Sequence, residues 1–225
     1  MQSLALRLKT ETRALHTAAE RSRFMQALLR GRMERPAYCA LLRNLHAIYE
    51  SLEPALSRHA RHPVLAPVYQ PALCRAPALA ADLNALHGAS WQHAFERQPA
   101  CGAYVARLRE IDATRPELLL AHAYVRYLGD LSGGQMLRRV VAESMHLPTD
   151  TGTAFYNFGE PRETLQLTQA FRVGLDEVVV DAASADAVVA EAVLAFRLFR
   201  DLFDELAHTC GVAERPPGSA ADPTP

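Results

Sequence analysis

Long apolar segments are lacking in this 225-residue chain, and so is an excess of either charge. No run approaches the ~18 uninterrupted apolar residues that a membrane-spanning helix needs, so we expect no membrane span. The formal net charge is −1, with 22% charged residues, which favours neither a nucleic-acid-binding surface nor a disordered acidic chain. The N-terminus enters a charged amphipathic pattern directly, which argues against a signal peptide. We expect a cytoplasmic protein that does not bind nucleic acid.

Cysteine is scarce and scattered, at Cys39, Cys74, Cys101 and Cys210. No C-x-x-C pair occurs, so neither a zinc site nor a disulfide framework is predicted. We expect four reduced, small apolar side chains.

Period-two alternation bounded by hairpin turns is also missing, which excludes an extensive β-sheet. The periodicity instead predicts an all-α fold. Helical patterns cover residues 3–22, 35–60, 99–114, 116–146, 161–181 and 185–210. Proline-rich connections punctuate them without a second core, so we expect one domain over residues 1–210. Residues 211–225 are poor in large apolar groups and are predicted to form a disordered, proline-rich tail.

One predicted helix contains three glycines, at Gly129, Gly133 and Gly134. Each costs a helix interior roughly 1 kcal/mol relative to alanine. At 100° per residue, Gly129 and Gly133 fall on one stripe, with Arg126 and Asp130 beside it. The full stripe comprises His122, Val125, Gly129, Gly133, Met136 and Val140.

Two uses of these glycines are open from the pattern alone. Small residues allow two helices to cross closely, and bare backbone allows a flat ligand to approach. The neighbouring charges of Arg126 and Asp130 favour a ligand site.

A second stripe lies on the first predicted helix, where Lys9, Arg13, His16 and Glu20 recur at spacings of four, three and four. A histidine between an apolar and a charged face can ligate a metal through one ring nitrogen, while a carboxylate one turn away acts on the other nitrogen or on a water. The alternative is a solvated helix face with ion pairs. The spacing alone leaves both interpretations open.

Residues 8–20 (Leu-Lys-Thr-Glu-Thr-Arg-Ala-Leu-His-Thr-Ala-Ala-Glu) and 121–135 (Ala-His-Ala-Tyr-Val-Arg-Tyr-Leu-Gly-Asp-Leu-Ser-Gly-Gly-Gln) together resemble the haem (heme) oxygenase family of the soluble bacterial type. The resemblance extends over residues 4–208, and the second stretch is the more specific. It implies a single all-α domain that holds haem b, both substrate and cofactor, between a proximal helix and a kinked distal helix.

The activity implied by the resemblance is oxidative cleavage of haem at a meso carbon, with the α position expected. Its products are biliverdin, CO and Fe²⁺, and it consumes O₂ and reductant. A non-catalytic haem-binding or storage protein is the alternative.

The resemblance also implies the roles of individual residues. His16 matches the iron ligand and Glu20 its polar neighbour. Gly129 and Gly133 match the distal backbone over the porphyrin. Asp130 is expected to position water, supported by hydrogen bonds from Tyr49 and Arg126.

The haem propionates need cationic or hydroxyl partners, which the resemblance places at Lys9, Arg13, Tyr124 and Arg172. Arg172 is the strongest of these candidates, because arginine can bind a carboxylate with two hydrogen bonds. The alternative is a solvated surface cation, which is favoured for Arg13 and is as plausible as a propionate partner for Lys9. Mammalian members carry a lysine near the position of Thr168. We therefore expect the haem propionates to have fewer cationic partners in this protein.

Two further expectations concern the pocket and the partners. Phe196 is a pocket candidate, although aromatic residues at helical spacing are more often core. The remaining histidines considered are not expected to ligate: His46, His87, His93, His122 and His146.

The chain has no flavin or nicotinamide fingerprint. We therefore expect a monomer that receives electrons from a ferredoxin or flavoprotein reductase, docked through cations such as Lys9 and Arg21.

Overall fold

A computed structural model describes residues 3–149 and 151–212. The described ranges are helical and contain no strand, so the predicted all-α class is confirmed. The α-helices are α1 (Leu4–Glu20), α2 (Arg23–Leu29), α3 (Arg35–Arg58), α4 (Ala76–His87), α5 (Trp91–Ala94), α6 (Pro99–Thr114), α7 (Leu119–Ser144), α8 (Pro161–Glu177) and α9 (Ala182–Thr209). Three 3₁₀ turns join them, η1 (Pro71–Leu73), η2 (Pro116–Leu118) and η3 (Ala154–Tyr156).

Local capping explains where several helices begin. The Ser3 hydroxyl accepts a hydrogen bond from the backbone N–H of Leu6 at the start of α1, and the Asp181 carboxylate does the same for Ser184 at the start of α9. Each cap satisfies one of the backbone N–H groups that the first helical turn leaves free. Glu160 and Glu163 form a capping box at the start of α8.

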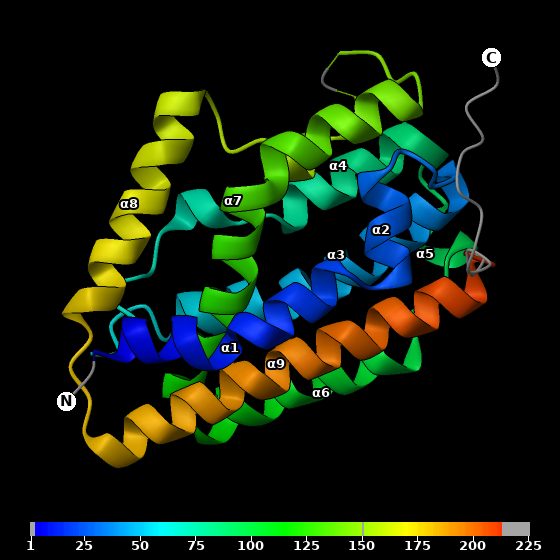
Figure 1. Cartoon of the computed structure of the whole chain (residues 1–225). Coiled ribbons are helices and arrows are strands. Elements are labelled where there is room, and N and C mark those ends of the chain that lie inside the picture. Colours follow the sequence, from blue (N-terminus) through cyan, green and yellow to red (C-terminus); the bar gives the residue numbers. More distant parts are fainter. Residues whose placement is uncertain (1–2, 150, 213–225) are drawn as a thin grey trace, which may run out of the picture.

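The long C-terminal helix α9 organises the domain. It packs against α1, α6 and α7. The second long helix, α3, packs against α4 and also against α6, so that α6 contacts both long helices. Figure 1 shows α1, α6 and α9 running side by side, with α8 standing at the edge of the molecule. The apolar stripe of α9 is buried through Val189, Phe199 and Phe203, as the periodicity predicts.

A glycine in α8 explains how this edge helix approaches the body. A Cβ atom built on Gly174 would lie 1.9 Å from the carbonyl oxygen of Pro67. Only a residue without a side chain allows α8 to pass so close to the loop before η1.

The C-terminal segment is described only as far as Val212. The backbone N–H of Val212 donates to the Ala207 carbonyl at 2.9 Å, and its side chain packs on the core. The rest of the predicted disordered tail lies outside the described residues. Among the described helices, none is long and apolar enough to cross a bilayer.

Candidate functional site

A cleft of about 170 Å³ lies where α1, α2, α7, α9 and η3 meet. His16 and Glu20 line it from α1, and Gly129, Asp130 and Gly133 line it from α7. The two stripes that the sequence singles out are therefore brought together, from helices more than 100 residues apart.

The α1 wall presents an imidazole. The Nδ1 atom of His16 lies 3.7 Å from Oε2 of Glu20, and the His16 ring packs edge-on against Phe196 with centroids 6.1 Å apart. The side chain of His16 is 48% exposed. Because Nδ1 faces Glu20, Nε2 is the ring nitrogen available to a metal on the cleft side.

The α7 wall is bare backbone. A Cβ atom built on Gly129 or on Gly133 would meet nothing within 4 Å, so protein packing does not require glycine at either position. Gly134 differs, because its Cβ would lie 3.4 Å from the carbonyl oxygen of Tyr156. Close packing against η3 therefore accounts for Gly134 alone, and the other two glycines leave the floor of a ligand site open.

The helix α7 is bent, as expected for a distal helix. Figure 1 shows its ribbon changing direction along its length. The Ser132 hydroxyl donates to the carbonyl oxygens of Leu128 (2.7 Å) and Gly129 (3.2 Å). Such bonds from a serine to the preceding turn favour helix bending, and they occur beside the glycines.

Behind the glycine wall, three buried polar side chains form a connected cluster. The Tyr49 hydroxyl donates to one carboxylate oxygen of Asp130, and the Arg126 guanidinium donates to the other at 3.2 Å. Arg126 Nε also donates to the Tyr49 oxygen at 3.3 Å. Tyr49, Arg126 and Asp130 are thus hydrogen-bonded to one another, and the Arg126–Asp130 contact is an ion pair one turn apart on α7.

The electrostatics of this cluster are set mainly by burial. Burial raises the pKa of Asp130, while the charge of Arg126 and the Tyr49 hydrogen bond oppose the rise. Burial also opposes the charged form of Arg126, but Tyr49, Asp130 and Tyr104 outweigh it, and the pKa of Arg126 is raised. The cleft is therefore backed by a fixed cation and by a carboxyl group whose proton affinity is increased.

Two positions on the predicted α7 stripe do not belong to the cleft. His122 is fully buried on the side of α6 and α9, where its ring nitrogens meet Tyr104 and Glu191. Val140 lies near Gly31 and does not line the cleft. The cleft therefore takes only the middle of the predicted stripe, from Val125 to Met136. Both ring nitrogens of His122 are occupied by protein partners.

The expected propionate partners lie outside the cleft lining. Lys9, Arg13 and Arg172 are exposed, and Tyr124 is half-buried and hydrogen-bonded to Thr12. The charge of Arg172 lowers the pKa of Tyr124, although burial outweighs it and the pKa is raised overall. Arg172 and Tyr124 are thus near each other, and Thr168 uses its hydroxyl on the Thr164 carbonyl.

Several lining residues escaped the sequence analysis. Phe199 and Phe203 share the helical spacing of Phe196 and were expected to be core, yet they line the cleft as well. From segments with no predicted helix come Met25, Leu28 and Leu29 of α2, and Phe155 and Tyr156 of η3. The spacing of the phenylalanines in α9 is compatible with either role, so it did not distinguish cleft from core.

The turn η3 is held in place by α4. The two carboxylate oxygens of Asp82 accept hydrogen bonds from the backbone N–H groups of Ala154 and Phe155, each at 2.7 Å. The Phe155 ring in turn packs against Tyr49, with centroids 5.8 Å apart. Asp82 therefore supports the wall without lining the cleft.

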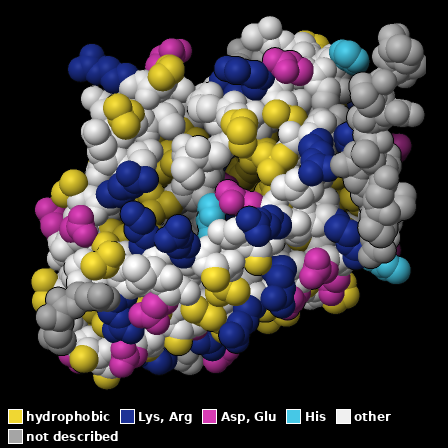
Figure 2. Space-filling model, viewed as in Figure 1, with side chains coloured by type: hydrophobic (Ala, Val, Ile, Leu, Met, Phe, Trp, Pro, Cys, Tyr) yellow, Lys and Arg dark blue, Asp and Glu magenta, His cyan; other side chains and the backbone are white. Residues whose placement is uncertain are grey.

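The surface around the cleft is cationic. Figure 2 shows a histidine and an acidic side chain near the middle of the viewed face, with Lys and Arg side chains on both sides and apolar side chains in a hollow beside them. Such a face suits an apolar ligand with anionic groups at its edge.

The fold and site define an all-α protein with a cleft between an imidazole on α1 and bare helical backbone on α7. Residues 2–205 match the model of the family described as "Heme oxygenase". The chain belongs to the haem oxygenase family.

Individual relatives agree with this assignment. The chain is 39% identical to "Heme oxygenase 1" of Nostoc sp., over 91% of this chain and 86% of that protein. It is also 39% identical to "Heme oxygenase 1" of Homo sapiens, over 91% of this chain and 72% of that protein. Among solved structures, heme oxygenase-2 from Synechocystis sp. PCC 6803 in complex with heme and NO matches with a TM-score of 0.88 and 38% identity, covering 93% of this chain and 87% of that one.

Proposed function

We propose that this protein binds haem in the cleft between α1 and α7 and opens it oxidatively to biliverdin, CO and Fe²⁺. The observation that carries the proposal is the open space above Gly129 and Gly133, on the α7 wall of the cleft that His16 lines from α1. Two glycines that packing does not need, in a helix that they destabilise, are accounted for by a ligand lying on the backbone.

The lining fits haem in its chemistry. Haem, when bound, is the compound oxidised and also supplies the iron at which dioxygen is activated. Nε2 of His16 would hold that iron, with Glu20 orienting the ring through Nδ1. The aromatic side chains of Phe196, Phe199 and Phe203 would pack against the apolar part of the macrocycle.

Tyr49, Arg126 and Asp130, the cluster behind the glycines, would deliver protons. Tyr49 and Arg126 each occupy one oxygen of the Asp130 carboxylate, which fixes its orientation. The remaining lone pairs of that carboxylate can hold a water molecule at the cleft, and its raised proton affinity suits it to organise proton transfer. Asp130 thus acts through water, and Tyr49 and Arg126 hold it in position.

The rim residues would set how haem lies in its own plane. Lys9, Arg13 and Arg172 are exposed cations available to propionates, and Tyr124 is near Arg172. In-plane rotation decides which meso carbon is attacked, so these residues would fix the position of cleavage, which we propose is α. An unchanged pattern of biliverdin isomers from Arg172→Ala would contradict this assignment.

Electrons would come from a separate protein, a ferredoxin or a flavoprotein. We propose that the enzyme itself is a monomer and lies in the cytoplasm. The cations seen around the cleft favour an acidic donor (Figure 2). Lys9 and Arg21 are exposed on the α1 side. Reversing both charges should slow reduction by the donor protein and leave reduction by a small chemical reductant unchanged. Equal rates with the donor protein would exclude this docking surface.

The activity is tested with purified protein, haem, a chemical reductant and O₂, following bilin formation by absorption and CO by haemoglobin trapping. Formation of both supports the proposal, and a stable haem spectrum without bilin indicates a storage protein. His16→Ala should lose the axial-ligand spectrum and regain it on addition of imidazole. His208→Ala, which removes an exposed histidine of α9, is the matched control.

A further inference from the structure

The edge helix α8 is attached to the body of the protein through a narrow face. Four of its 17 residues are buried: Thr164, Phe171, Gly174 and Leu175. The rest of the helix faces solvent, and even the apolar side chain of Val173 is 57% exposed. Among the helices, α8 packs against α1 and α7, and Figure 1 shows it standing apart at the side of the molecule. A helix with so small a buried face is positioned by few contacts, so each of them decides where it lies.

Two of these contacts lie within one turn of α8. The ring of Phe171, which is fully buried, packs edge-on against Tyr127 of α7, with centroids 6.4 Å apart. Three residues further on, Gly174 meets the loop before η1. A Cβ atom built there would lie 1.9 Å from the carbonyl oxygen of Pro67 and 3.3 Å from the backbone nitrogen of Val68. The first contact joins side chains, whereas the second brings two backbones together.

The loop at this second contact is held firmly. Two consecutive turns form it, in which the N–H of Leu65 donates to the His62 carbonyl at 2.9 Å and the N–H of Val68 donates to the Leu65 carbonyl at 3.0 Å. The side chains of Leu65 and Val68 are buried, and the ring of Pro67 fixes its own φ angle. The Pro67 carbonyl therefore cannot retreat easily, and it forms a fixed support for α8.

Arg172 lies between the two contacts along the helix. Because one turn of helix is rigid, the backbone position of Arg172 is set by Phe171 on one side and by Gly174 on the other. Arg172 is exposed and is one of the cations assigned above to the haem propionates. A bidentate bond between a guanidinium and a carboxylate has a defined geometry, so a displaced helix would displace the bound carboxylate with it.

We propose that Gly174 is a positioning residue that determines the regiospecificity of the reaction. By seating α8 on the Pro67 carbonyl, it sets where Arg172 holds the propionates, and so which meso carbon faces the oxidation site. Gly174 does not line the cleft and acts through Arg172. The inference rests on the proposed function, but the packing on which it depends can be measured without haem.

The first experiment measures amide hydrogen exchange in the haem-free protein. Gly174→Ala adds a methyl group for which the Pro67 carbonyl leaves no space, so α8 should shift and exchange should become faster in α8 and in residues 61–70. Gly102→Ala in α6, whose added Cβ meets nothing within 4 Å, is the matched control and should keep the wild-type rates in both segments. Unchanged exchange in Gly174→Ala would overturn the proposal.

The second experiment measures how haem lies in its plane, by proton NMR of the haem methyl groups in the ferric cyanide complex. The wild type should show one dominant orientation, and Gly174→Ala should add a second set of methyl resonances. In turnover, this variant should lose α-biliverdin and gain other isomers. Wild-type methyl resonances and isomers in Gly174→Ala would overturn the proposal and leave the enzyme assignment intact. A wild type that forms no bilin would refute the proposed function and this inference with it.

A double variant shows whether Gly174 acts through Arg172. Arg172→Ala should disturb the orientation of haem by itself, and Arg172→Ala combined with Gly174→Ala should give the same methyl resonances as Arg172→Ala alone. A further change in the double variant would mean that Gly174 acts by another route, which would overturn the proposal.

A variant on the other side of the contact covers the case in which Gly174→Ala does not fold. Pro67→Gly removes the ring that fixes the loop backbone and introduces no clash. The support for α8 should become softer, so the second set of methyl resonances should appear here as well, with lower intensity. Wild-type methyl resonances in Pro67→Gly would then overturn the proposal.

Discussion

The guanidinium carbon of Arg126 lies 4.1 Å from the centre of the Phe199 ring and 5.5 Å from that of Tyr49. A buried cation is thus enclosed by two aromatic faces, which partly replace the water it has lost. Because Phe199 belongs to α9 and Tyr49 to α3, the charge that faces Asp130 is held by three helices at once. The aromatic stripe of α9 is therefore part of the site's electrostatics as well as its apolar wall.

Replacing a cleft glycine should separate stability from activity. Gly133→Ala meets no protein atom and improves helix propensity, so the haem-free protein should be stabilised by up to about 1 kcal/mol while bilin formation falls, because the methyl group occupies the ligand's space. Urea unfolding and turnover assays measure the two effects. Gly102→Ala in α6, which also meets nothing within 4 Å, should stabilise the protein and leave turnover unchanged. Undiminished turnover in Gly133→Ala would refute the site assignment.

Removing the charge of Asp130 should affect chemistry more than binding. Asp130→Asn keeps the size of the side chain, so haem binding should persist, while bilin formation falls roughly 10-fold or more with the loss of the water-positioning carboxylate. Haem titration and product analysis distinguish the two. Asp176→Asn, at an exposed position of α8, is the control. A normal bilin yield from Asp130→Asn would show that this carboxylate is dispensable.

Weakening the link between α4 and η3 should loosen the cleft from a distance. In Asp82→Asn, the side-chain NH₂ group replaces one of the two oxygens that accept from the backbone N–H groups of Ala154 and Phe155. Two donors then face each other, which should lower the free energy of unfolding by about 1–3 kcal/mol. Because Phe155 packs on Tyr49, haem affinity should fall as well. Denaturant unfolding and haem titration test this, with Asn84→Asp, two residues further along the same helix, as a comparison. An unchanged affinity would show that η3 is held by its other contacts.

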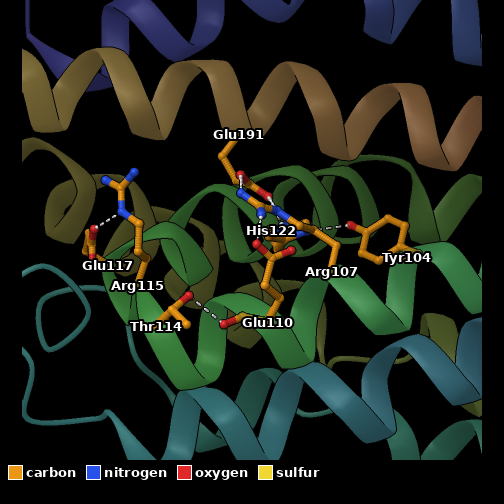
Figure 3. A network of polar contacts seen from close by, with 8 residues as sticks. All are labelled: Tyr104, Arg107, Glu110, Thr114, Arg115, Glu117, His122 and Glu191. Atoms are coloured by element: carbon orange, nitrogen blue, oxygen red, sulfur yellow. Dashed lines mark hydrogen bonds and ion pairs between the residues drawn. The ribbon is translucent and has the colours of Figure 1, made fainter.

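Acid should destabilise the fold through Glu191, a buried residue that is hydrogen-bonded to His122 and Arg107 (Figure 3). Its pKa is lowered from 4.5 to about 2 in the folded chain, so its contribution is complete above the unfolded value and is lost as the pH falls between about 4.5 and 2. With about 1.4 kcal/mol per pKa unit, the contribution is on the order of 3 kcal/mol. Unfolding measured across that range should be less pH-dependent in Glu191→Gln than in the wild type. Parallel curves would place the acid sensitivity elsewhere.

Strongly periodic segments made most of the fold predictable. The predicted ranges 35–60, 99–114 and 185–210 correspond closely to α3, α6 and α9, and α3 and α9 each have a wide apolar face. Helices α2 and α4 were missed for different reasons. Seven residues are too few to show a period, and the alanine-rich α4 has little contrast between its faces. What holds α4 is its packing on α3 and its bonds to η3, which no local pattern reveals.

The candidate site likewise has a part that the sequence predicts and a part that it does not. His16 and Gly129 were predictable because each belongs to a stripe on one helix and the family resemblance joins the two. The buried bond between His122 and Glu191 was not, since its partners are 69 positions apart and on helices whose crossing the sequence does not specify. Sequence periodicity places side chains on a face, and only packing decides which faces meet.

The cleft volume has a kinetic consequence. About 170 Å³ is below the roughly 300 Å³ at which clefts begin to hold drug-sized ligands, so the walls must separate before a macrocycle can enter. One of those walls is α2, a helix of only two turns, and another is the bent α7. Haem capture should therefore be limited by the rate at which these helices part, and the observed association rate should level off as the haem concentration rises.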